Sequence, residues 1–309
     1  MDLFINLLLL VAGFVMLVKG ADWFVDGAAG IAAKLKIPQI IIGLTIVAMG
    51  TSAPEAAVSI TSALQGNAGI TIGNIVGSNI LNVLVILGLA SVIISIAVGK
   101  STVNIDMPYM IGISAVLLIL GWDGVITRID GLILLTLFVT YIGYMIYEAI
   151  RSNDSGDEIK NLKWWQMLLC TVGGLALVVL GADVAVDAAT ALARIFGMSE
   201  RFIGLTVVAL GTSLPELVTS VTAARKGNAD IAIGNIVGSN IFNILFVVGL
   251  SSMIVDVPFA YNFRIDMLVA IVASVFLLLA SANDKKLVRK EGIMMLLGYA
   301  AYFTYLVMI

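Results

Sequence analysis

The stretch GTSAPE, residues 50–55, interrupts a long apolar run, and a near copy, GTSLPE, stands at residues 211–216. Each copy places a carboxylate, a proline and two hydroxyls among hydrophobic side chains. The copies belong to a longer repeat, because residues 43–91 align with residues 204–252 without a gap and are identical at 31 of 49 positions. A repeat whose best-matching part is polar indicates a duplicated site. The alternative is a duplication that only enlarged a helical bundle.

The composition indicates a polytopic membrane protein. Of the 309 residues, 61% are hydrophobic and 12% are charged, and the mean hydropathy is +1.10. A soluble domain is closer to half apolar and a quarter charged. A helix needs roughly 20 apolar residues to cross a hydrocarbon core of about 30 Å. We predict an all-α protein with ten transmembrane helices, whose runs begin near Leu3, Gln39, Ile70, Met107, Ile129, Trp164, Phe202, Ile231, Met267 and Ile293.

Basic residues are distributed unequally between alternate loops of these ten helices. With the N-terminus outside, twelve Lys and Arg residues fall in inside loops and four in outside loops, which follows the positive-inside rule. We therefore expect a cell-membrane protein with both termini extracellular. The inside residues are Lys34, Lys36, Lys100, Arg151, Lys160, Lys163, Arg225, Lys226, Lys285, Lys286, Arg289 and Lys290. The outside residues are Arg128, Arg194, Arg201 and Arg264.

The chain is predicted to form a single membrane transport domain over residues 1–309. Repeat 1 covers residues 1–150, a polar cytoplasmic linker covers 151–163, and repeat 2 covers 164–309. Five helices per repeat is an odd number, so repeat 2 enters the bilayer from the opposite face. Inverted repeats of this kind are typical of secondary transporters, whose binding site lies at the membrane midplane between the copies.

The residue inventory argues against several kinds of chemistry. The chain has no histidine and one cysteine, Cys170, so the usual zinc ligand and an intrachain disulfide are both missing. An intramembrane hydrolase needs a nucleophile with a base, or an aspartate dyad, and no Asp or Lys matches the depth of the motif glutamates. We expect a protein that is not an enzyme, with no cofactor, no nucleic-acid partner and no obligate protein partner.

The two motif glutamates are predicted to lie near the bilayer centre. Glu55 is sixteen residues into the run that begins at Gln39, and Glu216 takes the same depth in repeat 2. Acidic groups at that depth are costly and indicate function; the alternative is a protonated or ion-paired structural glutamate. Pro54 cannot donate a hydrogen bond to the carbonyl of Gly50, so the helix should kink or break there and free carbonyl oxygens.

The next helix of each repeat carries a polar stripe. Polar residues recur every four positions in GNIVGSNILN, residues 73–82, and in GNIVGSNIFN, residues 234–243, and therefore share one helix face. They are Asn74, Ser78 and Asn82, and Asn235, Ser239 and Asn243. The paired glycines of the same stretches fit close helix packing. Asn79 and Asn240 fall off the stripe and are interpreted as structural.

The combined inventory is rich in oxygen atoms. Thr51 shares a helix face with Glu55, as Thr212 does with Glu216, so each motif presents hydroxyl, carbonyl and carboxylate oxygens together. Hard cations prefer such ligands. Two carboxylates carry a charge of −2, which one divalent ion or two monovalent ions neutralise. The site is therefore predicted to alternate between the two kinds of ion.

The paired signature GTSAPE…GNIVGSNILN and GTSLPE…GNIVGSNIFN resembles the cation/calcium antiporter superfamily, and most closely its prokaryotic sodium/calcium exchanger branch, over essentially the whole chain. The resemblance implies two inverted five-helix repeats, with ions enclosed by helices two, three, seven and eight and gated by helices one and six. It implies Ca²⁺ ligands at Glu55, Glu216, Thr51 and Thr212. It implies one Na⁺ site at Ala48, Thr51, Ser52, Glu55 and Ser78, and a twin at Ala209, Thr212, Ser213, Glu216 and Ser239, with Asn82 and Asn243 between them.

These observations predict a secondary antiporter that exports Ca²⁺ in exchange for Na⁺ by alternating access. A Ca²⁺/H⁺ antiporter of the same fold is the alternative, because two glutamates can also hold two protons. The Thr-Ser pair beside each glutamate favours sodium, which needs the extra oxygen ligands. A cation channel, which requires no counter-ion, is a further alternative. Some relatives, including potassium-dependent exchangers, carry Asp where this chain has Asn243, so we expect potassium-independent exchange.

Two aspartate pairs lie on the predicted gating helices, Asp22 with Asp26 and Asp183 with Asp187. The pairs are separated by 161 residues, like the rest of the repeat. We interpret them as solvated positions near helix ends and not as ion ligands.

Overall fold

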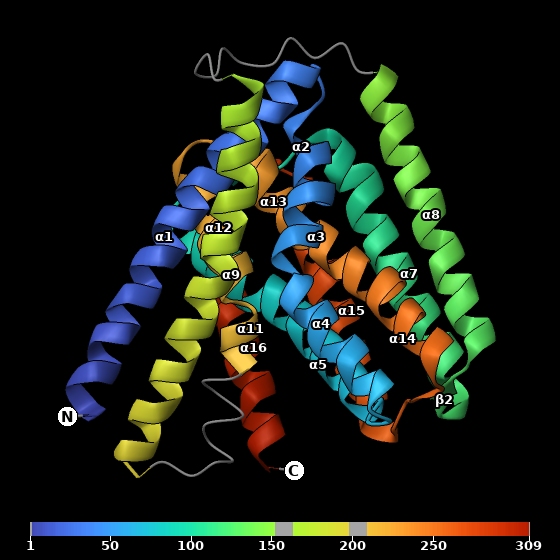
Figure 1. The fold of residues 1–309 in the computed structure, drawn as a ribbon. Helices are drawn as coiled ribbons and strands as arrows, with labels where there is room; N and C mark the ends of the chain where they lie inside the picture. Colours follow the sequence, from blue (N-terminus) through green and yellow to red (C-terminus); the bar gives the residue numbers. More distant parts are fainter. Residues whose placement is uncertain (1, 152–162, 198–208, 309) are drawn as a thin grey trace.

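The computed structural model describes residues 2–151, 163–197 and 209–308 as a bundle of helices (Figure 1). Repeat 1 contains α1 (Asp2–Leu35), α2 (Gln39–Ile42), η1 (Gly43–Val47), α3 (Ala48–Thr51), α4 (Ala53–Leu64), α5 (Gly69–Leu81), η2 (Asn82–Leu87), α6 (Gly88–Ile93), η3 (Thr102–Asp106), α7 (Met107–Leu120), η4 (Gly121–Asp123) and α8 (Arg128–Arg151). Repeat 2 contains α9 (Trp164–Ile195), α11 (Ala209–Thr212), α12 (Leu214–Arg225), α13 (Ala229–Phe242), η6 (Asn243–Val248), α14 (Gly249–Ile254), α15 (Tyr261–Ala282) and α16 (Arg289–Met308). The η segments are π-helical turns, except the 3₁₀ turn η4.

The all-α membrane fold is confirmed. Among the described residues, seven helices are long and apolar enough to cross a membrane, and the bent pair Gln39–Thr51 and Ala53–Leu64 makes an eighth candidate span. Two of the ten predicted runs are not among these eight. The start of the run from Phe202, residues 202–208, lies outside the described residues, so its described part is too short to count as a span. Helix α16 is less apolar, because it begins with three charged residues and carries three tyrosines.

Both ends of the described chain lie at one end of the bundle. Figure 1 shows the start of α1 and the end of α16 together, and the end of α8 and the start of α9 at the opposite end. This arrangement places the two termini on one side of the membrane and the flanks of the linker on the other. We call these the terminus side and the linker side.

A two-fold relation between the repeats is visible in the short strands. Ile96 of β1 (Ile96–Ala97) pairs with Leu287 of β4 (Lys286–Leu287), whereas Ile126 of β2 (Val125–Ile126) pairs with Val257 of β3 (Val257–Pro258). A shift of 161 residues converts Ile96 into Val257 and Ile126 into Leu287. Each small sheet therefore joins one repeat to the other, and the two sheets are equivalent by the duplication.

The two longest helices, α1 and α9, pack side by side in opposite directions (Figure 1). An added Cβ at Gly13 would lie 2.7 Å from the backbone nitrogen of Ala185, and one at Gly20 would lie 2.7 Å from that of Val178. Along this contact, residue numbers rise in α1 and fall in α9, so the two helices are antiparallel. Because α1 and α9 are the first helices of their repeats, the second copy is inverted relative to the first. The seam depends on glycine, because no side chain fits where the backbones approach so closely.

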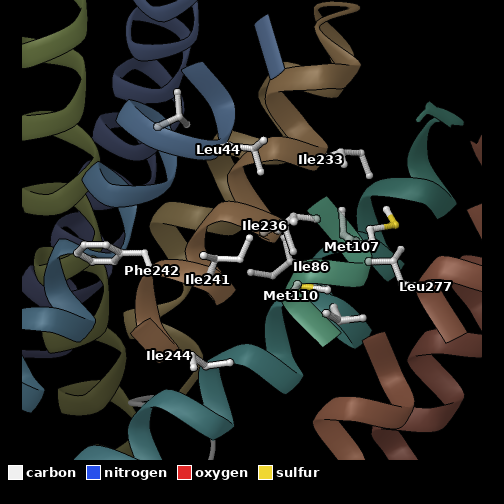
Figure 2. Packing of buried hydrophobic residues seen from close by; sticks show 14 of the residues in the cluster. Leu44, Ile86, Met107, Met110, Ile233, Ile236, Ile241, Phe242, Ile244 and Leu277 are labelled. Carbon is white, nitrogen blue, oxygen red and sulfur yellow. The ribbon is translucent and has the colours of Figure 1, made fainter. Parts of the chain in front are cut away.

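The core lies between the third helix of each repeat. In the span Ala229–Ile254, 94% of the most apolar window is buried, against 17% in Leu3–Leu35. Figure 2 shows residues from both repeats gathered in this core, including Ile86, Met107 and Ile236. The polar stripes of α5 and α13 are therefore held inside the protein and do not face lipid.

Glycine also ends the motif helices in the same way. Gly66 has φ 78° and follows α4, and Gly227 has φ 83° and follows α12. Both adopt the left-handed conformation that caps a helix C-terminus at low steric cost in glycine. The lengths of α4 and α12 are consequently equal in the two repeats, at 12 residues each.

We predict that Gly20→Ala lowers the thermal unfolding midpoint in detergent, because its Cβ would meet the α9 backbone and overpacking costs about 1–3 kcal/mol. Gly143→Ala on α8 is the matched control, since a Cβ there meets nothing within 4 Å. Higher helix propensity should leave that control unchanged or stabilise it by up to about 1 kcal/mol. Equal midpoints for the two variants would contradict the close seam.

Candidate ion-binding site

The predicted break at each motif is present. The axis of α2–α3 bends by 50° relative to α4. The bend falls at Ser52, which has φ −83° and ψ 9°, and Pro54 sits in the first turn of α4. In repeat 2 the corresponding Ser213 has φ −91° and ψ 4° and precedes Pro215 in the first turn of α12. The two copies therefore share one backbone conformation, as expected where proline removes a helical hydrogen bond.

The two motif glutamates occupy one interior site. Glu55 and Glu216 are each 1% exposed. Ser52 of repeat 1 donates a hydrogen bond to Oε1 of Glu216 at 2.9 Å. Glu55 in turn interacts with the Thr212 hydroxyl and with the negative charge of Glu216. Each acid is therefore held by a hydroxyl of the opposite repeat, and the two charges act on each other.

Positive side chains do not compensate these charges. Within residues 2–151, 163–197 and 209–308, the ion pairs involve Lys226 with Asp22 and Asp26, and neither motif glutamate takes part. The same residues contain no group of three or more Asp, Glu, His or Cys side chains suited to a metal. The ion-paired structural alternative is thus not supported, and the site has two carboxylates among otherwise neutral oxygens.

Several buried oxygens of the site have no hydrogen-bond partner. They come from both motifs and from the following helices: Oε2 of Glu55, Oε2 of Glu216, Oγ of Ser213, Oδ1 of Asn82 and Oδ1 of Asn243. A buried acceptor without a partner costs about 1–3 kcal/mol. Five such oxygens in one site fit a hard cation, which takes several oxygen ligands. The donor set therefore matches Ca²⁺ or Na⁺ in kind.

The predicted sodium ligands also lie around this site. Ser78 interacts with the Glu55 carboxylate, and Ser239 donates to the Ala48 carbonyl across the repeats at 3.4 Å. The Thr51 hydroxyl lies near Glu216 and donates to Oδ1 of Asn235 at 2.9 Å. Ala209 begins α11 and precedes Thr212 by three residues along the chain. The structure brings Thr51, Ser78 and Thr212 to the acids and Ser239 to the Ala48 carbonyl, while their roles as ligands stay predictions.

Asn74 and Asn235, the first members of the polar stripes, bind the motif helices and not the carboxylates. Asn74 donates to the Glu55 carbonyl at 3.2 Å and to Ser59 at 2.9 Å. Asn235 donates to the Glu216 carbonyl at 3.4 Å and to Ser220 at 2.9 Å. The two serines were missed from the sequence, although each stands four residues after its glutamate. They hold each motif helix to the stripe helix of the same repeat.

The remaining stripe positions mark a change in helix geometry. Asn82 is the first residue of the π-helical turn η2, and Asn243 is the first residue of η6. Single π-helical turns often occur at functional sites. Asn79 and Asn240, which fall off the stripe by spacing, are both buried and bond to each other across the interface between the repeats. Their interpretation as structural residues agrees with these bonds, but the spacing did not predict that they join the two repeats.

A cavity of about 440 Å³ reaches the motifs from one side. Its walls include Pro54, Pro215 and Thr212, together with Asp183 and Asp187 of α9. These two aspartates lie in the later half of α9, towards the terminus side. The interpretation of this pair as solvated positions agrees with their place on an open cavity.

At the equivalent position of repeat 1, the two aspartates form ion pairs with a lysine. Lys226 Nζ lies 2.8 Å from Oδ1 of Asp26 and 3.4 Å from Oδ1 of Asp22, and it donates to the Asp22 carbonyl at 2.7 Å. Lys226 follows α12, so the contact ties α1 to the end of the motif helix. The residue 161 positions earlier is Gln65. The two repeats therefore differ at this contact, and Asp22 and Asp26 are ion-paired rather than only solvated.

Two inverted repeats that enclose a buried anionic oxygen cluster define the class of secondary transporters, not enzymes. The sequence profile described as "Sodium/calcium exchanger protein" matches residues 5–147 and again residues 166–308. The chain therefore belongs to the sodium/calcium exchanger family, and it is a multi-pass membrane protein.

Several relatives match the chain over nearly its full length. It is 37% identical to the putative antiporter CaxA of Alkalimonas amylolytica over 94% of this chain and 95% of the relative. It is 32% identical to the sodium/calcium exchanger MaX1 of Methanosarcina acetivorans over 98% of each chain. A solved structure of the sodium-calcium exchanger NCX_Mj, soaked with zero Na⁺ and Ca²⁺, superposes with a TM-score of 0.87 and 32% identity, covering 98% of this chain and 99% of that one.

We predict that Ca²⁺ raises the unfolding midpoint of the purified protein, because a ligand that binds only the folded state stabilises it by about 2.7 kcal/mol at 100 times its dissociation constant. Glu216→Gln keeps the size of the side chain but removes its charge, and should lose most of this shift. Glu148→Gln on α8 is the control and should retain it. A full calcium shift in Glu216→Gln would show that this carboxylate does not bind the ion.

Proposed function

We propose that the protein is a secondary antiporter that exports Ca²⁺ from the cell in exchange for Na⁺ by alternating access. The ions bind at the membrane midplane between the repeats. The observation that carries this proposal is the pair of buried carboxylates, each held by hydroxyls of the opposite repeat and each with an oxygen that lacks a partner. The family match and the likeness to a sodium-calcium exchanger support it.

The proposed topology has ten spans in the cell membrane, with both termini extracellular and residues 151–163 cytoplasmic. It is supported by the placement of the two described ends on one side of the bundle (Figure 1) and by the excess of basic residues in alternate loops. In this topology the cavity on the terminus side opens to the outside. The Lys226 contact lies towards the cytoplasm.

Charge balance connects the two ions. A single Ca²⁺, or two Na⁺, neutralises the two carboxylates, so either load removes the repulsion between them. Ca²⁺ accepts six to eight oxygens with tolerant geometry. In the proposal Glu55, Glu216 and the carbonyls of Thr51 and Thr212 are the central Ca²⁺ ligands.

Each Na⁺ would share one of these carboxylates. The first sodium site takes the Ala48 carbonyl, Thr51, Ser52, Glu55 and Ser78. Its twin takes the Ala209 carbonyl, Thr212, Ser213, Glu216 and Ser239. Because both sites use the calcium ligands, the two kinds of ion compete for one set of oxygens, which is the requirement for exchange.

Coupling to sodium is favoured over coupling to protons by the hydroxyls around the acids. Ser52 and Thr51 contact Glu216, and Ser78 and Thr212 contact Glu55. A proton bound to a carboxylate needs no further oxygen ligand, whereas Na⁺ requires several. Four hydroxyl oxygens close to two acids therefore fit a metal ion better than a proton.

We expect sodium-loaded proteoliposomes to take up Ca²⁺ when sodium is diluted outside, because outward Na⁺ flow drives the exchange. Glu55→Gln and Glu216→Gln should each reduce uptake to the level of protein-free vesicles, since either change leaves a single carboxylate charge to balance the two positive charges of Ca²⁺. Vesicles that carry only a proton gradient form the second arm. Uptake in that arm alone would replace sodium by protons as the driving ion, and uptake with no counter-ion gradient would indicate a channel.

Sodium-driven calcium uptake should be unchanged when K⁺ is replaced by choline on both sides of the membrane. The reason is that both central side chains, Asn82 and Asn243, are amides, so the site lacks a third carboxylate to balance an extra cation. The measurement is the initial rate of uptake at matched ionic strength. Loss of transport without K⁺ would refute this expectation.

A further inference from the structure

We propose that Asn79 and Asn240 are positioning residues that turn the amide oxygens of Asn82 and Asn243 towards the transported cations. The inference rests on the proposed exchange of cations at this site. It concerns two residues that do not contact the carboxylates. They act through the hydrogen bonds that they make across the interface between the repeats.

The orientation of the Asn79 and Asn240 amides is fixed by the backbone. Nδ2 of Asn79 donates to the Asn240 carbonyl at 3.3 Å, and Nδ2 of Asn240 donates to the Asn79 carbonyl at 3.3 Å. A backbone carbonyl only accepts hydrogen bonds, so the nitrogen of each amide must face it. The oxygen of each amide therefore faces the other way, and its direction is not arbitrary.

These two oxygens in turn fix the central amides. Oδ1 of Asn240 accepts a hydrogen bond from Nδ2 of Asn82 at 2.9 Å, and Oδ1 of Asn79 accepts one from Nδ2 of Asn243 at 3.1 Å. An oxygen acceptor selects the nitrogen end of the amide that it meets. The Oδ1 atoms of Asn82 and Asn243 are left at the opposite ends, buried and without a hydrogen-bond partner.

The central amides begin turns that pack against the motif helices. The turn η2, which starts at Asn82, contacts α12, and η6, which starts at Asn243, contacts α4. These helices carry Glu216 and Glu55, respectively. The central amides thus begin turns that pack against the helices carrying the acids of the opposite repeat. We infer that their orientation determines what the ions meet at the centre of the site.

Amide orientation decides between two kinds of site. With its oxygen inward, an asparagine adds an acceptor that a cation can use as a ligand. With its nitrogen inward, it would donate hydrogen bonds to the carboxylates and occupy the oxygens that the ion needs. Asn79 and Asn240 select the first arrangement, and so keep the two central amides as acceptors towards the site.

The test is calcium affinity in Asn79→Leu, which removes the acceptor for Asn243 and frees that amide to turn. We expect the calcium concentration for half-maximal sodium-driven uptake to rise about tenfold or more, as is typical when a partner of a metal ligand is removed. Asn240→Leu should behave alike, because it frees Asn82. Ser114→Ala is the control and should have no effect, since this buried hydroxyl bonds only within its own helix, to the Met110 carbonyl.

A double variant separates positioning from general structural support. Asn243→Asp places an oxygen at both ends of the side chain, so its orientation needs no acceptor from Asn79. Adding Asn79→Leu to Asn243→Asp should therefore change the half-saturating calcium concentration by no more than about threefold, well below the change of a lost positioning partner. An equal loss of affinity in both backgrounds would assign Asn79 a structural role and overturn the proposal.

Wild-type transport distinguishes this failure from failure of the proposed function. If the wild type shows neither sodium-driven uptake nor a calcium-dependent rise in its unfolding midpoint, the proposed exchange is wrong. If the wild type exchanges Ca²⁺ for Na⁺, and Asn79→Leu and Asn240→Leu have the same half-saturating calcium concentration as the wild type, only the positioning role is wrong. Should neither leucine variant give monodisperse protein, Asn79→Ser and Asn240→Ser carry the same comparison, because serine is too short to reach across the interface.

Discussion

The burial of two carboxylates in one site, with no basic partner in the described part of the chain, is the constraint on which the rest of the architecture depends. Repulsion between like charges is stronger inside a protein than in water, and removing each charge from water costs several kcal/mol. Hydroxyls of the opposite repeats offset only part of this cost, because Oε2 of both Glu55 and Glu216 lacks a partner. A bound cation relieves both penalties. In the proposed exchange the unloaded carrier is therefore the costly state, and this disfavours a return without an ion.

Neither repeat contains a complete site. Ser52 reaches Glu216, and Thr212 reaches Glu55, so each acid depends on the other copy. The contact of Ser239 with the Ala48 carbonyl follows the same rule. Duplication thus did more than enlarge a bundle, because the interface between the copies brings the acids of each together with hydroxyls of the other, and the proposed site lies there. A displacement of one repeat relative to the other would change the ligand geometry of both halves at once, which links ion binding to movement.

Sequence patterns predicted what lies within one copy and the location of the site between the copies, but they missed individual contacts that join the copies. The break at Pro54 and the burial of the acids follow from residue type and position along a single helix. The role of Asn79 does not, because helical spacing compares residues on one helix, whereas the partners of Asn79 are 161 and 164 residues away. The contact between Lys226 and Asp26 was missed for the same reason, because these residues are 200 positions apart in the sequence. Hydropathy predicted a membrane span that begins near Ile293. The structure has a helix there, α16, but its charged first residues leave it outside the candidate spans.

The packing of α1 and α9 explains why the cavity lies on the terminus side. On the linker side, α1 joins the main core through residues such as Phe24 and Val25, and Lys226 ties it to α12. On the terminus side, a separate small cluster holds the pair: Leu17, Ala21, Val178, Ala182 and Ala185, with Leu10, Leu214 and Val218 packed against it. In the proposed alternating access, this small separate cluster marks the half of the pair that moves against α12, whereas the linker half is held by the Lys226 ion pair and by the main core. In the proposed alternating access, the Lys226 contact opens as the cavity closes. Because Gln65 stands at the equivalent position of repeat 1, the two proposed access states differ in this contact, even though their proposed ligands are related by symmetry.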